Sequence, residues 1–197
     1  MQRYEEKKFL IPELKGLSHK QVEEHLKLYA GYVKHVNLIR EKIHELEADQ
    51  EKNAYLISEL RRRFSFEFNG MRMHEYYFET FEGGAREIPE NTPLKKSLAE
   101  KYGNFEAWIL HMRAVALTRG IGWAVLYYDP VGKVPHTVWV GDHELGTLAG
   151  LPIILALDMW EHAYMVDYTP SEKKEYVNAF FENVNWGMTE KRFKNVQ

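Results

Sequence analysis

The sequence predicts an α+β protein in which an N-terminal helical hairpin is followed by a C-terminal α/β domain with a small antiparallel sheet. Two patterns predict this fold class. Over residues 18–81 the apolar side chains recur at spacings of three and four, which is the period of an amphipathic helix. Beyond residue 120 the pattern changes to short runs of β-branched and aromatic residues separated by turn signals, which is typical of strands.

The first helix of the hairpin is predicted over residues 18–49. Ser18 is a favoured N-cap residue, and the apolar stripe that follows it continues to Leu46. Gly31 interrupts the stripe, at a cost of roughly 1 kcal/mol relative to alanine. A glycine at such a place indicates a close contact or a bend, so we expect one of these at Gly31.

The second helix is predicted over residues 54–81, and the glycine pair at 83–84 ends it. Two consecutive helices with a short connection form an antiparallel hairpin. The polar loop that follows the second helix is the natural boundary between domains. We therefore expect an N-terminal helical domain at 1–88 and a C-terminal domain at 89–197.

The C-terminal domain is predicted to hold two short helices, then three strands, then a closing helical stretch. The first two strands flank a turn and form a β-hairpin, and the third is a continuous apolar run that reads as a buried strand. In chain order, these elements are expected at residues 94–102, 104–118, 122–128, 136–140, 151–158 and 171–193.

Composition excludes several classes of protein. The chain has no cysteine, which excludes disulfides and thiolate metal sites. Its net charge of −3 argues against a nucleic-acid partner, which would favour a basic balance. No stretch of the sequence is apolar over the ~18 residues that a bilayer crossing needs, and no secretory signal is visible at the charged N-terminus. We therefore expect a cytoplasmic protein without a membrane partner.

Candidate metal ligands appear at the end of the third strand. Asp158 and His162 are four residues apart, a spacing that places both side chains on one face of a helical turn. A carboxylate with an imidazole suits iron, manganese or zinc, although a hydrogen-bonded pair or a cap would have the same spacing. His25 and His74 lie among aromatic residues on the two predicted helices, where each is either a further ligand or a core histidine.

Four segments together resemble the iron/manganese superoxide dismutases. The segment DMWEHAY resembles the family signature D-x-W-E-H-[AS]-[YF], and NVNWGMTEKRF resembles the C-terminal motif N-x-x-N-W-x-x-x-x-x-R-[FY]. GIGWAVL and HEYYF resemble two further motifs, with Val125 where the family has Trp and Met73 where it has Asn. The similarity covers residues 17–193 in order, and the family has the helical-hairpin-then-α+β organisation expected above.

The resemblance implies disproportionation of the superoxide anion to O₂ and hydrogen peroxide at one iron or manganese ion per chain. Three metal ligands fall on His74, Asp158 and His162. The first ligand of the family lies eight residues before a tyrosine that matches Tyr32, and that position holds Glu24, whereas His25 lies seven residues before. We favour His25, because seven residues are two turns of a regular helix, but the two readings stay open.

The resemblance also assigns residues around the metal. Tyr32 matches the gate tyrosine, Tyr29 is the expected stand-in for a histidine that shields the gate, and His143 falls near the position that hydrogen-bonds the metal-bound solvent, unless it is a polar turn residue. Glu161 matches a glutamate that bonds across a two-fold interface, which implies a homodimer and leaves a tetramer open. The residues expected to wall the site are Tyr77, Trp123 and Trp160.

Two other functions use the same residues. If neither candidate on the first helix coordinates, then His74, Asp158 and His162 form a two-His, one-carboxylate set, the arrangement of non-haem iron oxygenases. The altered motif on the first helix also fits a non-catalytic metal-binding homologue. The three intact ligands argue against that second alternative.

Overall fold

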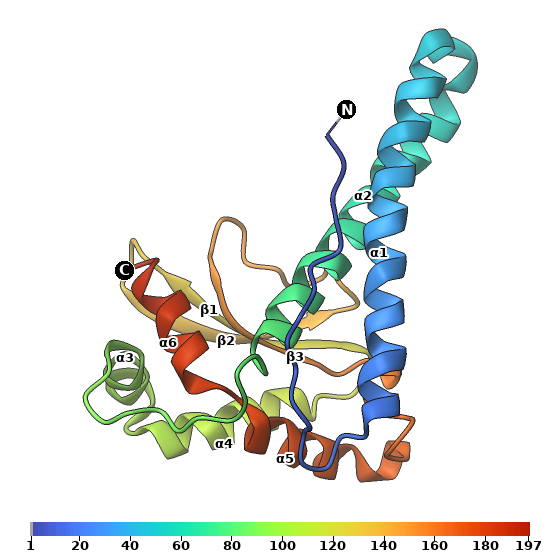
Figure 1. Cartoon of the computed structure of the whole chain (residues 1–197). Coiled ribbons are helices and arrows are strands. Elements are labelled where there is room, and N and C mark those ends of the chain that lie inside the picture. The colour runs from blue at the N-terminus through green and yellow to red at the C-terminus, as the bar shows by residue number, and fades with distance from the viewer. Residues whose placement is uncertain (1) are drawn as a thin grey trace.

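The computed structural model describes residues 2–197 and confirms the α+β fold class. Two long antiparallel helices form the N-terminal hairpin, and a three-stranded sheet with shorter helices forms the rest (Figure 1). The elements are α1 (His19–Leu46), α2 (Gln50–Glu79), α3 (Pro93–Tyr102), α4 (Phe105–Ala116), β1 (Gly122–Asp129), β2 (Val134–Gly141), β3 (Ile153–Asp158), α5 (Lys173–Asn183) and α6 (Trp186–Lys194), with 3₁₀ helices η1 (Glu47–Asp49), η2 (Glu161–Ala163) and η3 (Pro170–Glu172).

The far part of the hairpin projects away from the body, and its near part packs on the sheet (Figure 1). Ser18 caps α1 as expected, with its hydroxyl accepting from the Gln21 N–H at 3.0 Å. Helix α2 begins four residues before the predicted residue 54, because Asp49 caps it. A methyl group built on Gly31 meets nothing within 4 Å, so of the two features expected there, a close contact or a bend, the close contact is absent.

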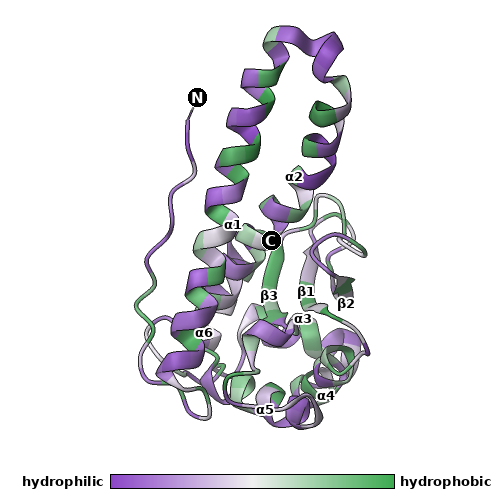
Figure 2. Cartoon of the chain, turned by 90° about the vertical axis from the view of Figure 1, so that its right-hand side faces the viewer, coloured by the Kyte–Doolittle hydropathy of each residue, from purple (hydrophilic) through white to green (hydrophobic). Residues whose placement is uncertain are grey.

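The sheet has the strand order β2-β1-β3, and both pairings are antiparallel. The central strand β1 is buried along nearly its whole length, and β3 is buried after its first residue, which explains their continuous apolar sequences. Figure 2 shows hydrophobic colouring along β3 and mixed colouring on the hairpin helices. Strand β3 contacts α2 and α6, and this packing carries the end of β3 to the hairpin.

The closing helical stretch is two helices, α5 and α6, where the sequence predicted one. Val184 has extended backbone, and the Asn185 side chain accepts from the Gly187 N–H at 3.0 Å to cap α6. The break therefore falls at an asparagine, a residue whose short amide side chain competes with helix continuation.

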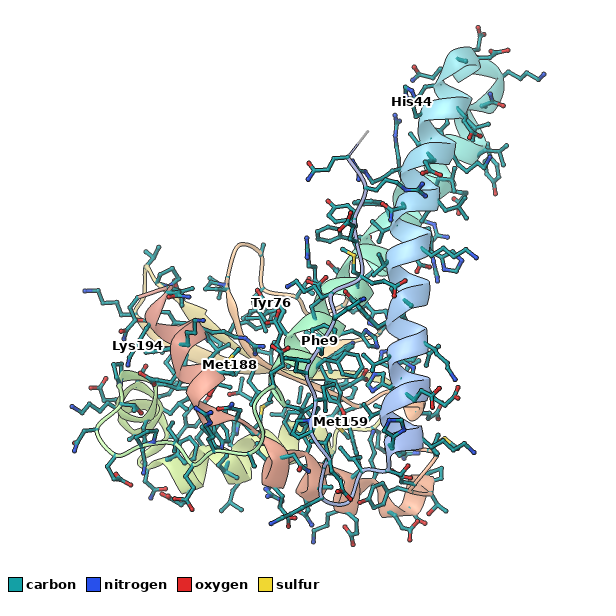
Figure 3. The ribbon with its side chains drawn as sticks, in the orientation of Figure 1. Phe9, His44, Tyr76, Met159, Met188 and Lys194 are labelled. Atoms are coloured by element: carbon teal, nitrogen blue, oxygen red, sulfur yellow. The ribbon has the colours of Figure 1, made fainter. Side chains whose placement is uncertain are left out.

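An extended segment, residues 2–13, runs along the hairpin, and we call it the N-terminal strap. The Asn37 side chain on α1 exchanges two hydrogen bonds with the Tyr4 backbone, both at 2.9 Å. The Phe9 ring packs on Tyr29 and Phe78, and Figure 3 shows Phe9 beside the hairpin, with His44 far away toward its tip. In residues 2–197 no helix is long and apolar enough to span a membrane.

Candidate metal centre

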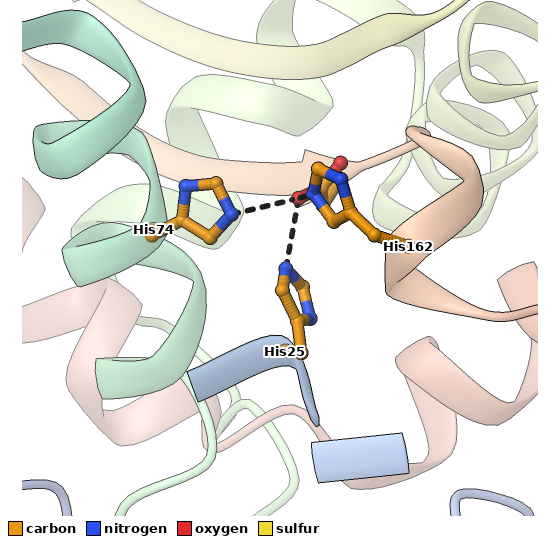
Figure 4. A group of neighbouring side chains, drawn as sticks. His25, His74 and His162 are labelled. Atoms are coloured by element: carbon orange, nitrogen blue, oxygen red, sulfur yellow. Dashed lines mark hydrogen bonds and ion pairs between the residues drawn. The ribbon is translucent and has the colours of Figure 1, made fainter. Parts of the chain in front are cut away.

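The structure brings four sequence-predicted residues together: His25 from α1, His74 from α2, Asp158 from the end of β3 and His162 from η2. One donor atom from each lies within 4.8 Å of the other three. Figure 4 shows the three imidazoles converging on one carboxylate. The Nε2 atoms of His25, His162 and His74 lie 3.0, 3.1 and 3.5 Å from Asp158 Oδ2.

The local route from Asp158 to His162 differs from the predicted helical turn. Asp158 is the last residue of a strand, and its Oδ1 accepts the Trp160 N–H at 2.8 Å, so the carboxylate itself forms the turn that follows. His162 then lies in the short 3₁₀ helix η2. Gln21 of α1 fixes η2 from the other side, because its amide donates to the His162 carbonyl at 2.7 Å and accepts from the Val166 N–H at 2.9 Å.

The structure places one of the two candidates on the first helix in the cluster. His25 is 1% exposed and its ring faces the cluster. Glu24 points outward, where its exposed carboxylate pairs with Lys27 at 2.9 Å. His25 therefore belongs to the cluster and Glu24 does not. A regular helix with a seven-residue spacing to Tyr32 is enough to place it there.

Three of the four donors, His25, His74 and Asp158, have the protonation states that a cation needs. Burial lowers the pKa of His25 and lowers that of His74 still further, so both rings are neutral. Burial would raise the pKa of Asp158, but its interactions with the His162 and His25 imidazoles hold it well below its usual range, so the carboxylate is ionised. Metal ligands must be neutral imidazoles and ionised carboxylates, so the electrostatics suit a metal.

The hydrogen bonds of His74 leave one donor atom of the cluster without a partner among the described residues. His74 Nδ1 lies 2.6 Å from the Gly70 carbonyl, which only accepts, so the ring proton is on Nδ1 and Nε2 carries a lone pair. That Nε2 is fully buried and has no hydrogen-bond partner among the described residues. A buried lone pair aimed at a carboxylate is costly unless a cation lies between them, so the residues fit a metal ion.

A second chain of hydrogen bonds lies beside the cluster. The Trp123 indole donates to His143 Nδ1 at 2.9 Å, and His143 Nε2 lies 2.8 Å from the Tyr32 hydroxyl. An indole N–H can only donate, so His143 Nδ1 accepts and the proton of the neutral ring is on Nε2. Burial lowers the pKa of His143 to about 4, which keeps the ring neutral near pH 7.

His143 therefore donates to the Tyr32 oxygen, and the hydroxyl proton of Tyr32 stays available for another acceptor. The sequence placed His143 near the position that hydrogen-bonds metal-bound solvent, and in the structure both of its ring nitrogens are engaged, by Trp123 and by Tyr32. His143 is no exposed turn residue, since it is 0% exposed. Gly70 makes this arrangement possible. A Cβ at residue 70 would lie 2.7 Å from the Tyr32 ring.

Aromatic rings surround the cluster, and they include the three that the resemblance implied. The Trp160 ring stacks on His162 with centroids 5.6 Å apart, and the Tyr77 ring lies 4.9 Å from that of His25. Trp123 packs edge-on against His74 at 5.0 Å. Glu161 is exposed beside the cluster.

Tyr29 does not occupy the gate position that the resemblance implies. Its hydroxyl accepts the Lys7 N–H at 2.9 Å and lies 3.3 Å from Glu75, so the side chain serves the N-terminal strap. Burial raises the pKa of Tyr29 to about 12. The hydrogen-bond partners of the Tyr29 hydroxyl explain the difference, because Lys7 of the strap and Glu75 of α2 engage it.

Sequence reasoning missed two side chains that touch this region. The Tyr176 hydroxyl donates to the Asp158 carbonyl at 2.7 Å, and the Phe66 ring lies 4.6 Å from that of His143. Phe66 lies eight residues before His74, whereas two turns of a regular helix are about seven residues, so this spacing gave no clear sign of a shared face. No local pattern marks Tyr176, because its contact depends on how α5 packs under β3.

Comparisons with known proteins agree with this geometry. The family profile described as iron/manganese superoxide dismutases, C-terminal domain, matches residues 89–192. An iron superoxide dismutase of Aquifex pyrophilus is 33% identical over 198 residues, which cover 98% of this chain and 92% of the relative. The chain belongs to the iron/manganese superoxide dismutase family.

Relatives named for each metal are similar to this member of the family. An iron superoxide dismutase of Cupriavidus metallidurans is 34% identical over 91% of this chain and 90% of its own length. A manganese superoxide dismutase of Haloarcula marismortui is 39% identical over 59% of this chain and 56% of its own length. The names of the relatives therefore include both metals.

Proposed function

We propose that this protein is a superoxide dismutase that converts two superoxide anions and two protons into one O₂ and one hydrogen peroxide. The observation that carries the proposal is the cluster of three imidazoles and one buried carboxylate, with an Nε2 of His74 that has no hydrogen-bond partner among the described residues, in a chain of this family. The expected cofactor is one iron or manganese ion per chain.

The proposed ligands are His25, His74, Asp158 and His162. A bound iron or manganese ion would supply a one-electron couple between its trivalent and divalent states, which suits imidazole and carboxylate donors. The Trp160 N–H donates to the Asp158 carboxylate, and the Tyr176 hydroxyl donates to the Asp158 backbone carbonyl. Such outer contacts fix the orientation of ligands and tune the metal that they hold.

We assign the delivery of protons for the reaction to Tyr32 and His143. Because His143 donates to the Tyr32 oxygen, the Tyr32 hydroxyl is oriented to give its own proton to a group in the site. Burial raises the pKa of Tyr32, so the hydroxyl is protonated near pH 7. The surrounding rings of Trp123, Trp160 and Tyr77 limit the access of bulk water.

Two further predictions concern the assembly and the location. The exposed Glu161 has Met165 and Val166 nearby, with 50% and 43% of these residues exposed, which supports a homodimer through this face. Sedimentation of the wild type and of Glu161→Ala tests the dimer, and a monomeric wild type would contradict it. The cytoplasmic location stays a prediction from the sequence, and cell fractionation tests it.

The activity is tested by stopped-flow superoxide decay with protein loaded separately with iron and with manganese. We expect decay faster than buffer with at least one metal, and loss of that rate in Asp158→Ala. Asp129→Ala is the matched control, because it removes a carboxylate at the end of another strand, β1, away from the cluster. Stoichiometric metal without superoxide consumption would leave a non-catalytic metal-binding homologue.

A further inference from the structure

The loop that carries His143 is tied to helix α2 by two side chains. The Asn69 amide donates to the His143 carbonyl at 2.8 Å, and the Ser65 hydroxyl hydrogen-bonds to the Glu144 carboxylate. Ser65 and Asn69 are four residues apart and therefore lie on one face of α2. The same helix carries His74, so α2 positions both a proposed ligand and the loop beside it.

The loop needs such support at His143. The preceding residue, Asp142, has a φ of 50°, a left-handed conformation that residues other than glycine rarely adopt. The Trp160 indole donates to the Asp142 carbonyl at 3.2 Å. Separate elements thus hold the two carbonyls around His143. Trp160, which follows β3, binds the Asp142 carbonyl, and Asn69 of α2 binds the His143 carbonyl.

Both nitrogen atoms of the His143 ring already have partners, Trp123 and Tyr32. Their geometry depends on where the His143 backbone lies, because a short side chain follows any shift of its Cα. The Asn69 amide is the contact from α2 that fixes this backbone at the carbonyl. Its neighbour Gly70 leaves room for the Tyr32 ring, so two consecutive residues of α2 shape both ends of the His143–Tyr32 hydrogen bond.

We propose that Asn69 is a positioning residue, which holds the His143 imidazole in line between the Trp123 indole and the Tyr32 hydroxyl. Its catalytic consequence rests on the proposed superoxide dismutase activity, whereas its structural consequence does not. Loss of the Asn69 donor frees a buried carbonyl, and the His143 loop then shifts to find another partner.

The first test measures the Trp123 indole N–H by NMR in the full-length protein. In Asn69→Ala we expect its proton shift to move upfield and its hydrogen exchange to become about tenfold faster, the range that one net hydrogen bond covers. Asn69→Asp keeps the shape but replaces the donor with an acceptor, so it should show the same change. It also serves as the second variant if Asn69→Ala folds poorly.

Asn53→Ala is the matched control. Asn53 lies on the same helix, and its amide donates to the Leu46 carbonyl at 3.0 Å, far from the cluster at the tip of the hairpin. Urea unfolding of each variant separates local from global effects. If the Trp123 indole responds no more in Asn69→Ala than in Asn53→Ala, then Asn69 is merely structural and the proposal is overturned.

The second test measures superoxide decay with metal-loaded variants. We expect Asn69→Ala to lower kcat about tenfold at unchanged metal content, and Asn53→Ala to leave kcat unchanged. An unchanged kcat in an active protein would contradict the catalytic part of the proposal. If the wild type itself consumes no superoxide, the proposed function fails, and the NMR result still decides whether Asn69 positions His143.

Discussion

At the scale of single residues, the direction of one hydrogen bond determines what Tyr32 can do. Trp123 can only donate, so His143 must accept from it and donate to Tyr32. The Tyr32 proton is then free to leave toward the site. A histidine can fill this place because its two nitrogens accept on one side and donate on the other.

Removing the Tyr32 hydroxyl should slow proton delivery and leave the donor cluster intact. We expect Tyr32→Phe to lower kcat roughly tenfold to a hundredfold. This loss is at or below the smallest rate contribution typical of a general acid, because solvent also supplies protons. Metal per chain should be unchanged, because the four clustered donors remain. Stopped-flow superoxide decay with metal analysis checks this prediction, and an unchanged kcat would remove Tyr32 from the proton path.

Four clustered residues could be predicted from the sequence, and some of their neighbours could not. Asp158 and His162 were visible because polar ligand types directly follow a buried apolar strand. The choice of His25 over Glu24 followed from helix periodicity. Tyr29 was misplaced, because nothing in its own helix indicates that Lys7 and Glu75 would engage its hydroxyl.

At the scale of elements, the two glycines of the hairpin have opposite roles. Gly31 lies within α1 with nothing near its missing Cβ, whereas a Cβ on Gly70 of α2 would lie 2.7 Å from the Tyr32 ring. Both positions are helical, so both should gain from alanine in helix propensity alone. Only the surroundings differ.

We therefore expect Gly31→Ala to raise the free energy of unfolding by about 0.5–1 kcal/mol. Gly70→Ala should lower it, by about 1–3 kcal/mol, because the added methyl displaces the Tyr32 ring. Gly70→Ala should also reduce superoxide consumption, and Gly31→Ala should not. Urea unfolding measures the stability of both variants, and stopped-flow decay measures their activity. A stabilised, fully active Gly70→Ala would contradict the packing described here.

Element type was predictable from the sequence, but several boundaries were not. Helix α1, its Ser18 cap and the three strands follow from strong local periodicity. The division between α5 and α6 was missed, because Asn185 caps a helix in the middle of an otherwise helical sequence. The 3₁₀ helix at His162 was missed because Asp158 itself makes the turn.

At the scale of the whole molecule, Glu79 connects three distant segments. Its carboxylate pairs with Lys7 of the strap at 2.8 Å and with Arg192 of α6 at 3.0 Å. Burial would raise the pKa of Glu79, but hydrogen bonds and charge from Lys7 and Arg192 lower it below its usual value of 4.5. A lowered pKa stabilises the fold above the unfolded-state pKa, and this stability is lost as pH falls through the folded value.

Glu79→Gln should therefore make the free energy of unfolding depend less on pH in the acid range. We expect the difference in unfolding free energy between wild type and variant to be about 1 kcal/mol or less near pH 7, since the pair is partly exposed. The difference should shrink as pH falls below 4.5. Urea unfolding of the metal-free protein between pH 3 and 7, roughly the range over which a carboxylate titrates, checks this. A difference that stays constant with pH would contradict it.

The central claim is that one buried cluster, His25 with His74, Asp158 and His162, holds a single iron or manganese ion. The most direct measurement is metal per chain in His25→Ala and Glu24→Ala after identical loading. The account predicts that His25→Ala loses most of its metal, because the cluster loses one of its four donors. Glu24→Ala should keep the wild-type content, since its carboxylate is exposed and paired with Lys27. Full metal in His25→Ala together with loss in Glu24→Ala would contradict the account.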